Sequence, residues 1–222
     1  MDRDHRSNRM TAWTRTNPPL TTIRGSAHNY TMSFVLMRDG DRDPLDLIAP
    51  YQRASVWTFG QRRALIKSAL LGIAPGAIYV SALPYSTPDG PSYRVVDGKQ
   101  RVETYRMFAN NEFAVPAEWF PDVDLDLDMI AEDGRVTYAM LSQRGQRGYE
   151  NTSVPIVEVN FQTEWIEVEP GTGTNGTSHQ FNLVDRNADE VLAKEVELYL
   201  LLNTAGTDHT EADIAHAKGM QS

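Results

Sequence analysis

The sequence contains no cysteine and no long run of apolar residues. Without cysteine, disulfides, thiolate nucleophiles and zinc–thiolate centres are all excluded. No window approaches the roughly 18 consecutive apolar residues that a membrane-spanning helix needs, and the charged N-terminus is not followed by the apolar segment of a signal peptide. We therefore expect a protein of the cytoplasm, or of the host cytoplasm if the chain is viral, with no membrane partner.

Several common catalytic motifs are also missing. The five histidines form no His-Glu-x-x-His pair, and no serine stands in a Gly-x-Ser-x-Gly turn. The glycine-rich stretch 171–177 lacks the Gly-Lys-Ser/Thr ending of a phosphate-binding loop. The acidic stretch 120–133 resembles half of a calcium loop, but Leu127 and Asp133 stand where such a loop has glycine and glutamate. We expect that stretch to be a solvated segment.

The charge balance is acidic but uneven. The chain of 222 residues is 41% hydrophobic and 23% charged, which suits one globular domain with a sizeable core. Its net charge of -9 argues against a surface built for non-specific nucleic-acid binding. Residues 52–67 nevertheless carry four basic side chains and no acidic one. This segment is either a local basic face for a short piece of nucleic acid or a set of solvated arginines and a lysine.

The pattern of apolar residues and turn residues predicts an α/β fold of the α+β kind, with a mixed sheet and a helical C-terminal section. Residues 1–30 are expected to form a mobile arm, and residues 31–222 a single domain. We expect a hairpin insertion near 165–184. The expected strands are 31–37, 77–83, 92–96 and 154–161, and the expected helices are 58–72, 98–110, 138–149, 188–202 and one that begins at residue 210.

The most informative segment is Tyr93-Arg94-Val95-Val96-Asp97-Gly98-Lys99-Gln100-Arg101. It predicts a strand that passes through Asp-Gly directly into a helix. The N-terminus of such a helix offers free N–H groups and the positive end of the helix dipole, both of which favour an anion such as phosphate. Lys99 and Arg101 add positive charge, and Asp97 could hold a metal or a proton. An ordinary turn that ends a strand is the alternative interpretation.

Three motifs in order resemble a known family. They are Pro50-Tyr51-Gln52-Arg53 with Trp57 and the 61–73 helix, then Val95-Val96-Asp97-Gly98-Lys99-Gln100-Arg101, then the 201–210 segment. Together they resemble the N-terminal domain of the GmrSD-type modification-dependent restriction enzymes, within the ParB/sulfiredoxin-like superfamily. The family signature is usually Asp-Gly-Gln-Gln-Arg, so Lys99 departs from it, as Ala205 and His209 do in the third motif.

The resemblance implies binding and hydrolysis of a nucleoside triphosphate, with the Asp-Gly-x-Gln-Arg segment essential. We therefore expect ATP or another nucleoside triphosphate and Mg²⁺ as cofactors, and DNA, including modified DNA, as a partner. The expected catalytic residues are Asp97, Gln100 and Arg101, with Asp97 also as metal ligand. The expected nucleotide contacts are Gln52, Arg53, Gly98, Lys99, Asn203 and Gly206. The expected nucleic-acid contacts are Tyr51, Trp57, Arg62 and Arg63.

The resemblance therefore implies an enzyme that transfers a phosphoryl group, either as a kinase for hydroxymethyl-pyrimidine bases in DNA or as a DNA-stimulated NTPase. Tyr51 or Trp57 would stack on a flipped base, although both also suit a core position. The nuclease module of multidomain relatives does not follow within these residues, so we expect either a separate effector subunit or a self-contained phosphoryl chemistry. The alternative is a non-catalytic subunit that senses nucleotide or DNA.

Overall fold

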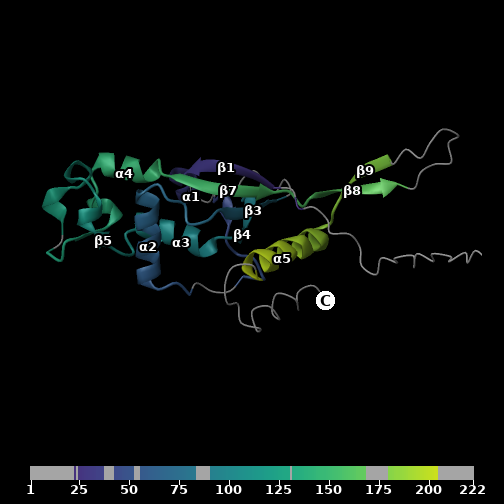
Figure 1. Ribbon diagram of the computed structural model, residues 1–222, viewed down its shortest axis with the longest axis horizontal. Coiled ribbons are helices and arrows are strands. Elements are labelled where there is room, and N and C mark those ends of the chain that lie inside the picture. Colours follow the sequence, from purple (N-terminus) through teal and green to yellow (C-terminus); the bar gives the residue numbers. More distant parts are fainter. Residues whose placement is uncertain are drawn as a thin grey trace, which may run out of the picture.

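A five-stranded mixed sheet forms the centre of the molecule (Figure 1). The computed structural model describes residues 23, 25–37, 43–52, 56–83, 91–130, 132–168 and 180–204. The strands are β1 (Gly25–Thr31), β2 (Leu45–Asp46), β3 (Ile78–Ala82), β4 (Tyr93–Asp97) and β7 (Ser153–Val159), in the order β1-β7-β3-β4-β2. The pairs β1–β7 and β3–β4 are antiparallel, whereas β3–β7 and β2–β4 are parallel. The expected α+β fold with a mixed sheet is confirmed.

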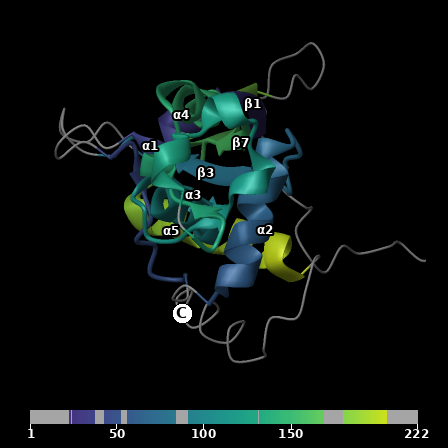
Figure 2. The same ribbon diagram turned by 90° about the vertical axis from the view of Figure 1, so that its left-hand side faces the viewer.

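Helices cover both faces of this sheet. Successive residues of a strand point to opposite faces, and on β4 Val95 belongs to one apolar core while Val96 belongs to another. The first core packs under α1 (Met32–Leu36), α2 (Phe59–Leu70), α3 (Lys99–Ala109) and α4 (Gln143–Glu150). The second packs under α5 (Ala188–Thr204). Figure 2 shows α4 and α5 at opposite edges of the molecule, with β3 between them.

Local sequence signals set the ends of the helices that flank the sheet. Thr58 and Gln61 form a complete capping box at the start of α2, where the sequence predicts a helix. Gly72 follows the end of α2 with φ of 70°, the left-handed conformation that glycine adopts most easily. The β4–Gly98–α3 junction is the strand-to-helix turn expected from the sequence.

Three predicted elements differ from the structure. The expected strand at 31–37 is wrong: β1 ends at Thr31 and α1 follows, because Met32 and Val35, three residues apart, are both fully buried on one helical face. The expected mobile arm therefore does not include residues 25–30, which pair with β7. The expected helix at 138–149 is a 3₁₀ turn (Tyr138–Met140) followed by α4, which Ser142 caps.

The remaining elements are short. β5 (Val115–Pro116) pairs with β6 (Arg135–Val136), and the exposed acidic stretch between them holds 3₁₀ turns at Asp122–Asp124 and Leu127–Met129, with another at Ala117–Trp119 before them. The predicted hairpin is present as β8 (Thr163–Val168) paired with β9 (Gln180–Asp185), and it projects from the body in Figure 1. Residues 1–22, the hairpin tip and the helix expected from residue 210 lie outside the described residues. Among the helices that the structure describes, none has the length and apolarity required to cross a membrane.

Candidate functional site

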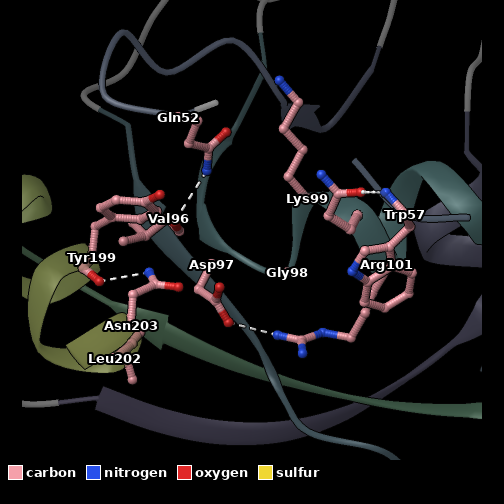
Figure 3. Close-up of a pocket in the computed structure, with 11 residues that line it drawn as sticks. Gln52, Trp57, Val96, Asp97, Gly98, Lys99, Arg101, Tyr199, Leu202 and Asn203 are labelled. Carbon is pink, nitrogen blue, oxygen red and sulfur yellow. Dashed lines mark hydrogen bonds and ion pairs between the residues drawn. The ribbon is translucent and has the colours of Figure 1, made fainter. Parts of the chain in front are cut away.

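A pocket of about 310 Å³ opens where β4 meets α3. Its walls come from three parts of the chain: the segment around residues 52–57, the β4–α3 junction and the end of α5 (Figure 3). The lining residues are Gln52, Trp57, Val96, Asp97, Gly98, Lys99, Gln100, Arg101, Tyr199, Leu202 and Asn203. The structure thus brings segments that are about 40 and 100 residues apart in sequence to one concave site.

Gly98 makes the sharp turn from strand to helix possible. Its φ is 99°, a left-handed conformation that costs other residues strain. An added Cβ would also lie 3.1 Å from Cγ1 of Ile78 and 3.1 Å from Nη2 of Arg101. Position 98 therefore requires glycine for both backbone and space. No side chain caps this end of α3, and its first turn holds no acidic residue, so the helix start remains a favourable place for an anion.

Asp97 and Arg101 form an ion pair at the edge of the pocket. Arg101 Nη2 donates to Asp97 Oδ2 at 2.6 Å and to the carbonyl oxygen of Ala77 at 2.8 Å. The Arg101 side chain is only 17% exposed, and its Nε is buried without a hydrogen-bond partner. Arg101 therefore ties the junction to the segment that precedes β3, and the two charges largely compensate each other.

Among the described residues that line the pocket, Lys99 carries a positive charge that no neighbouring carboxylate balances. The remaining lining residues apart from the Asp97–Arg101 pair are neutral. Within the part of the chain that the structure describes, no carboxylate lies within ion-pair distance of Lys99. Among the described residues, the pocket thus combines the start of α3 with an ammonium group that no carboxylate pairs, and this combination suits a phosphate-bearing ligand.

Gln52 lines the pocket and has a buried amide oxygen without a partner. Its Nε2 donates to the carbonyl oxygens of Val95 at 2.6 Å and Val96 at 3.0 Å. Because only the amide nitrogen can donate to carbonyls, these bonds fix which end of the amide is the oxygen. The Oε1 atom is buried and has no hydrogen-bond partner. A bound ligand with an N–H or O–H group could satisfy it.

Gln100 holds the segment that carries Trp57. Its Oε1 accepts from the backbone N–H groups of Val56 and Trp57, each at 3.2 Å. Sequence reasoning expected Gln100 to be catalytic, but in this structure its carboxamide oxygen is used to place one wall of the pocket. Trp57 itself is half-buried and lines that wall.

Two of the residues expected to contact nucleic acid lie in the interior instead. Tyr51 is 2% exposed, packs against the ring of Tyr199 at 5.3 Å and donates to Glu195. Burial and the nearby Glu195 carboxylate raise the pKa of Tyr51, so the phenol remains a neutral donor. Arg62 is 7% exposed and donates to Thr104 at 3.0 Å. Both side chains therefore take their partners from the core and α3, and for Tyr51 this is the core position that the sequence left open.

The other expected residues fall in three places. Arg63 is half-buried on α2 and donates from Nε to the carbonyl oxygen of Ala114, outside the pocket. Asn203 lines the pocket, but from the last turn of α5 rather than from the predicted turn, and it donates to the carbonyl oxygen of Tyr199 at 2.7 Å. Arg53 and Gly206 lie outside the described residues.

Sequence reasoning missed two side chains of the α5 wall. Tyr199 and Leu202 line the pocket beside Asn203. Their signal was helical spacing, since Tyr199 stands one turn before Asn203 and therefore shares its face. Among the described residues no group of three or more histidine, aspartate or glutamate side chains could hold a metal ion.

The fold and pocket define a mixed α+β domain with a polar pocket at a strand-to-helix junction. Residues 35–219 match the family described as GmrSD restriction endonuclease, N-terminal domain. The chain belongs to this family, and the resemblance drawn from the three motifs is confirmed. The family's description connects the chain to restriction systems. A search of curated proteins and a search of solved structures each found no match.

Proposed function

We propose that the pocket binds a nucleoside triphosphate and that the protein transfers the terminal phosphoryl group. The observation that carries this proposal is the meeting of Gln52, the Asp97–Arg101 segment and Asn203 in one pocket. Core packing alone does not require that three segments of polar and charged residues, far apart in the sequence, meet at one place. Their meeting supports a ligand that is anionic at one end and offers hydrogen-bond donors at the other.

The phosphates would lie at the start of α3. There the Lys99 ammonium and the first backbone amides of the helix supply the positive potential. The other end of the ligand would face Gln52 and the α5 wall, where Gln52 Oε1 accepts a hydrogen bond from the ligand.

The donor set fits a Mg²⁺ ion that is bound together with the phosphates. Mg²⁺ in such sites needs one or two carboxylates, with phosphate oxygens and waters completing its shell. Asp97 supplies one carboxylate, with one oxygen engaged by Arg101. When bound, the ion would neutralise charge on the transferred group. The role of Arg101 is to hold the Asp97 carboxylate in a fixed orientation while tethered to Ala77.

In the transfer itself, the chain positions the reactants. A hydroxyl oxygen of water or of a second substrate forms a bond to the terminal phosphorus, and the bond to the bridging oxygen of the nucleotide breaks. The nucleoside diphosphate leaves, and the hydroxyl proton passes to solvent or to Asp97. This chemistry needs positioning and charge stabilisation more than covalent help, and Lys99 and the α3 amides are suited to both.

We further propose that the acceptor or activator is DNA, and that the acceptor hydroxyl of the kinase belongs to a hydroxymethyl-pyrimidine in modified DNA. The family's restriction context supports DNA as the partner. Trp57 supports it chemically, because an indole in a pocket wall can stack on a base that has left the duplex. The acidic net charge of -9 favours weak binding that falls steeply with salt.

One observation favours a second candidate, a non-catalytic subunit that senses nucleotide or DNA for a separate effector. Asp97 is already paired with Arg101 at 2.6 Å, so its carboxylate is engaged before any ligand binds. A pocket of this kind can bind a nucleotide and respond to it without turning it over.

Two assays separate these functions. Purified protein is incubated with labelled ATP, GTP or CTP and Mg²⁺, with and without DNA, and phosphate release or transfer is followed. Phosphoryl transfer predicts turnover that Asp97→Ala abolishes, whereas binding without turnover supports the sensor. Mass analysis of nucleosides from hydroxymethyluracil or hydroxymethylcytosine DNA then shows whether a phosphate has been added. DNA-stimulated hydrolysis without added phosphate identifies the NTPase.

A further inference from the structure

A glutamate is completely buried on the inner face of α5. Glu195 is 0% exposed, and its Oε2 accepts from Arg94 Nη1 at 3.2 Å and from the Tyr51 hydroxyl at 3.4 Å. Its second oxygen, Oε1, is buried without a hydrogen-bond partner. A buried carboxylate is costly unless it is paired, so the position of α5 over these two donors matters to the protein.

Arg94 connects Glu195 to two strands of the sheet. Arg94 lies on β4, and its Nε donates to Asp46 Oδ2 on β2 at 3.1 Å while its Nη1 reaches Glu195. Asp97 follows three residues later on the same strand. The guanidinium therefore fixes α5 directly to the strand whose end forms the pocket floor.

Tyr51 connects the same cluster to two pocket walls. Its ring packs on Tyr199, which lies one helical turn after Glu195 and lines the pocket. Its neighbour in sequence is Gln52, which lines the pocket. Figure 3 shows Tyr199 and Asn203 on α5 facing the side of the pocket that holds Gln52 and Asp97.

We propose that Tyr51, Arg94 and Glu195 are positioning residues that fix α5 against β4 and so hold the α5 wall of the pocket in its binding position. A buried ion pair often contributes less to stability than apolar residues of the same size would, but its geometry is directional. That property suits a helix whose exact placement decides whether a site is complete. The ligand in this inference rests on the proposed function, whereas the placement of α5 does not.

The absence of cysteine allows α5 to be located by spin labels. Cysteines introduced at Leu201, which is 54% exposed on α5, and at Asn110, exposed at the end of α3, carry the two labels. Double electron–electron resonance measures the distance between them in the labelled parent, Tyr51→Phe and Glu195→Gln. Tyr138→Phe is the matched control. It also removes a hydrogen bond from a tyrosine to a glutamate, the 2.7 Å bond between Tyr138 and Glu150, but neither residue lines the pocket.

We expect a narrow distance distribution in the parent and in Tyr138→Phe, and a broadened or shifted one in Tyr51→Phe and Glu195→Gln. Binding of a Mg²⁺–nucleoside triphosphate should weaken roughly fivefold in Tyr51→Phe, the effect of one buried hydrogen bond. Unchanged distances in both variants would overturn the inference. If Glu195→Gln does not fold, Tyr51→Phe alone decides, since it deletes a single oxygen. Failure of the parent to bind any nucleotide would overturn the proposed function while leaving the distance result valid.

Discussion

The guanidinium of Arg101 occupies the space that a side chain on Gly98 would need. A Cβ on Gly98 would lie 3.1 Å from Nη2 and 3.2 Å from Nε of Arg101. The same guanidinium bonds Asp97 and the carbonyl oxygen of Ala77. The residues of the Asp-Gly-Lys-Gln-Arg segment therefore depend on one another. The absence of a side chain on the glycine leaves space for the arginine guanidinium, and the arginine orients the aspartate.

This relationship predicts the effect of Gly98→Ala. The φ of 99° and the contact with Arg101 should together cost about 1–3 kcal/mol of unfolding free energy, measured by urea denaturation. Gly148→Ala in α4 is the control, because a Cβ there meets nothing within 4 Å, and alanine in a helix should stabilise by about 0.5–1 kcal/mol. Equal stability of both variants would contradict this account of the junction.

Gln52→Leu should weaken nucleotide binding. The change removes the unpartnered amide oxygen proposed to bind the ligand and the two hydrogen bonds that fix the amide to β4. We expect a loss of affinity of roughly tenfold, measured by isothermal titration calorimetry. Gln146→Leu is a close control, since Gln146 Nε2 also donates to two backbone carbonyls, those of Tyr138 and Leu141, outside the pocket. An equal loss in both variants would mean that the effect is on folding and not on the ligand.

Stability should fall in alkaline solution because buried tyrosines must remain neutral. Burial raises the pKa of Tyr105 to about 12 from 10.0, and burial also raises the pKa of Tyr149. When a group has a higher pKa in the folded protein than in the unfolded chain, it stabilises the fold fully at pH values below the unfolded-state pKa. This stabilisation is lost as the pH rises through the folded-state pKa. The loss should therefore begin near pH 10.0 and continue toward about 12.

Urea midpoints measured from about pH 8 to about pH 11 test this. The midpoint should hold below pH 10.0 and decline above it, with a shallower decline in Tyr105→Phe. A midpoint that does not change over the whole range would contradict the assignment of these phenols to the core.

Much of the pocket could be predicted from sequence because its residues carry local signals. The β-branched run before Asp97 and the glycine after it predict a strand-to-helix turn, and that turn is present. The capping box at Thr58 and Gln61 sets the start of α2 in the same way. These features depend on residues that are close in sequence, so they can be inferred without knowing the fold.

The rest depends on long-range packing. Glu195 stands between Lys194 and Val196 in a helix that also carries Glu197, a pattern that suggests a solvated face, yet Glu195 is fully buried because Arg94 and Tyr51 meet it from the sheet. Tyr51 and Arg62 are residue types that often contact nucleic acid, and only their partners in the folded protein show that they are buried in the interior. The α1 segment differs from the predicted strand because a short apolar run fits either a strand or a helix.

The central claim is that the start of α3 and Lys99 bind the phosphates of a nucleotide. Calorimetric titration with a nucleoside tri-, di- and monophosphate in Mg²⁺ tests it most directly, using the parent, Lys99→Gln and the control Lys67→Gln on α2, which lies outside the pocket. We predict that affinity falls with each phosphate removed, that Lys99→Gln weakens triphosphate binding roughly tenfold, and that Lys67→Gln binds as the parent does. Equal affinity of the parent and Lys99→Gln for all three nucleotides, or no binding at all, would contradict the account.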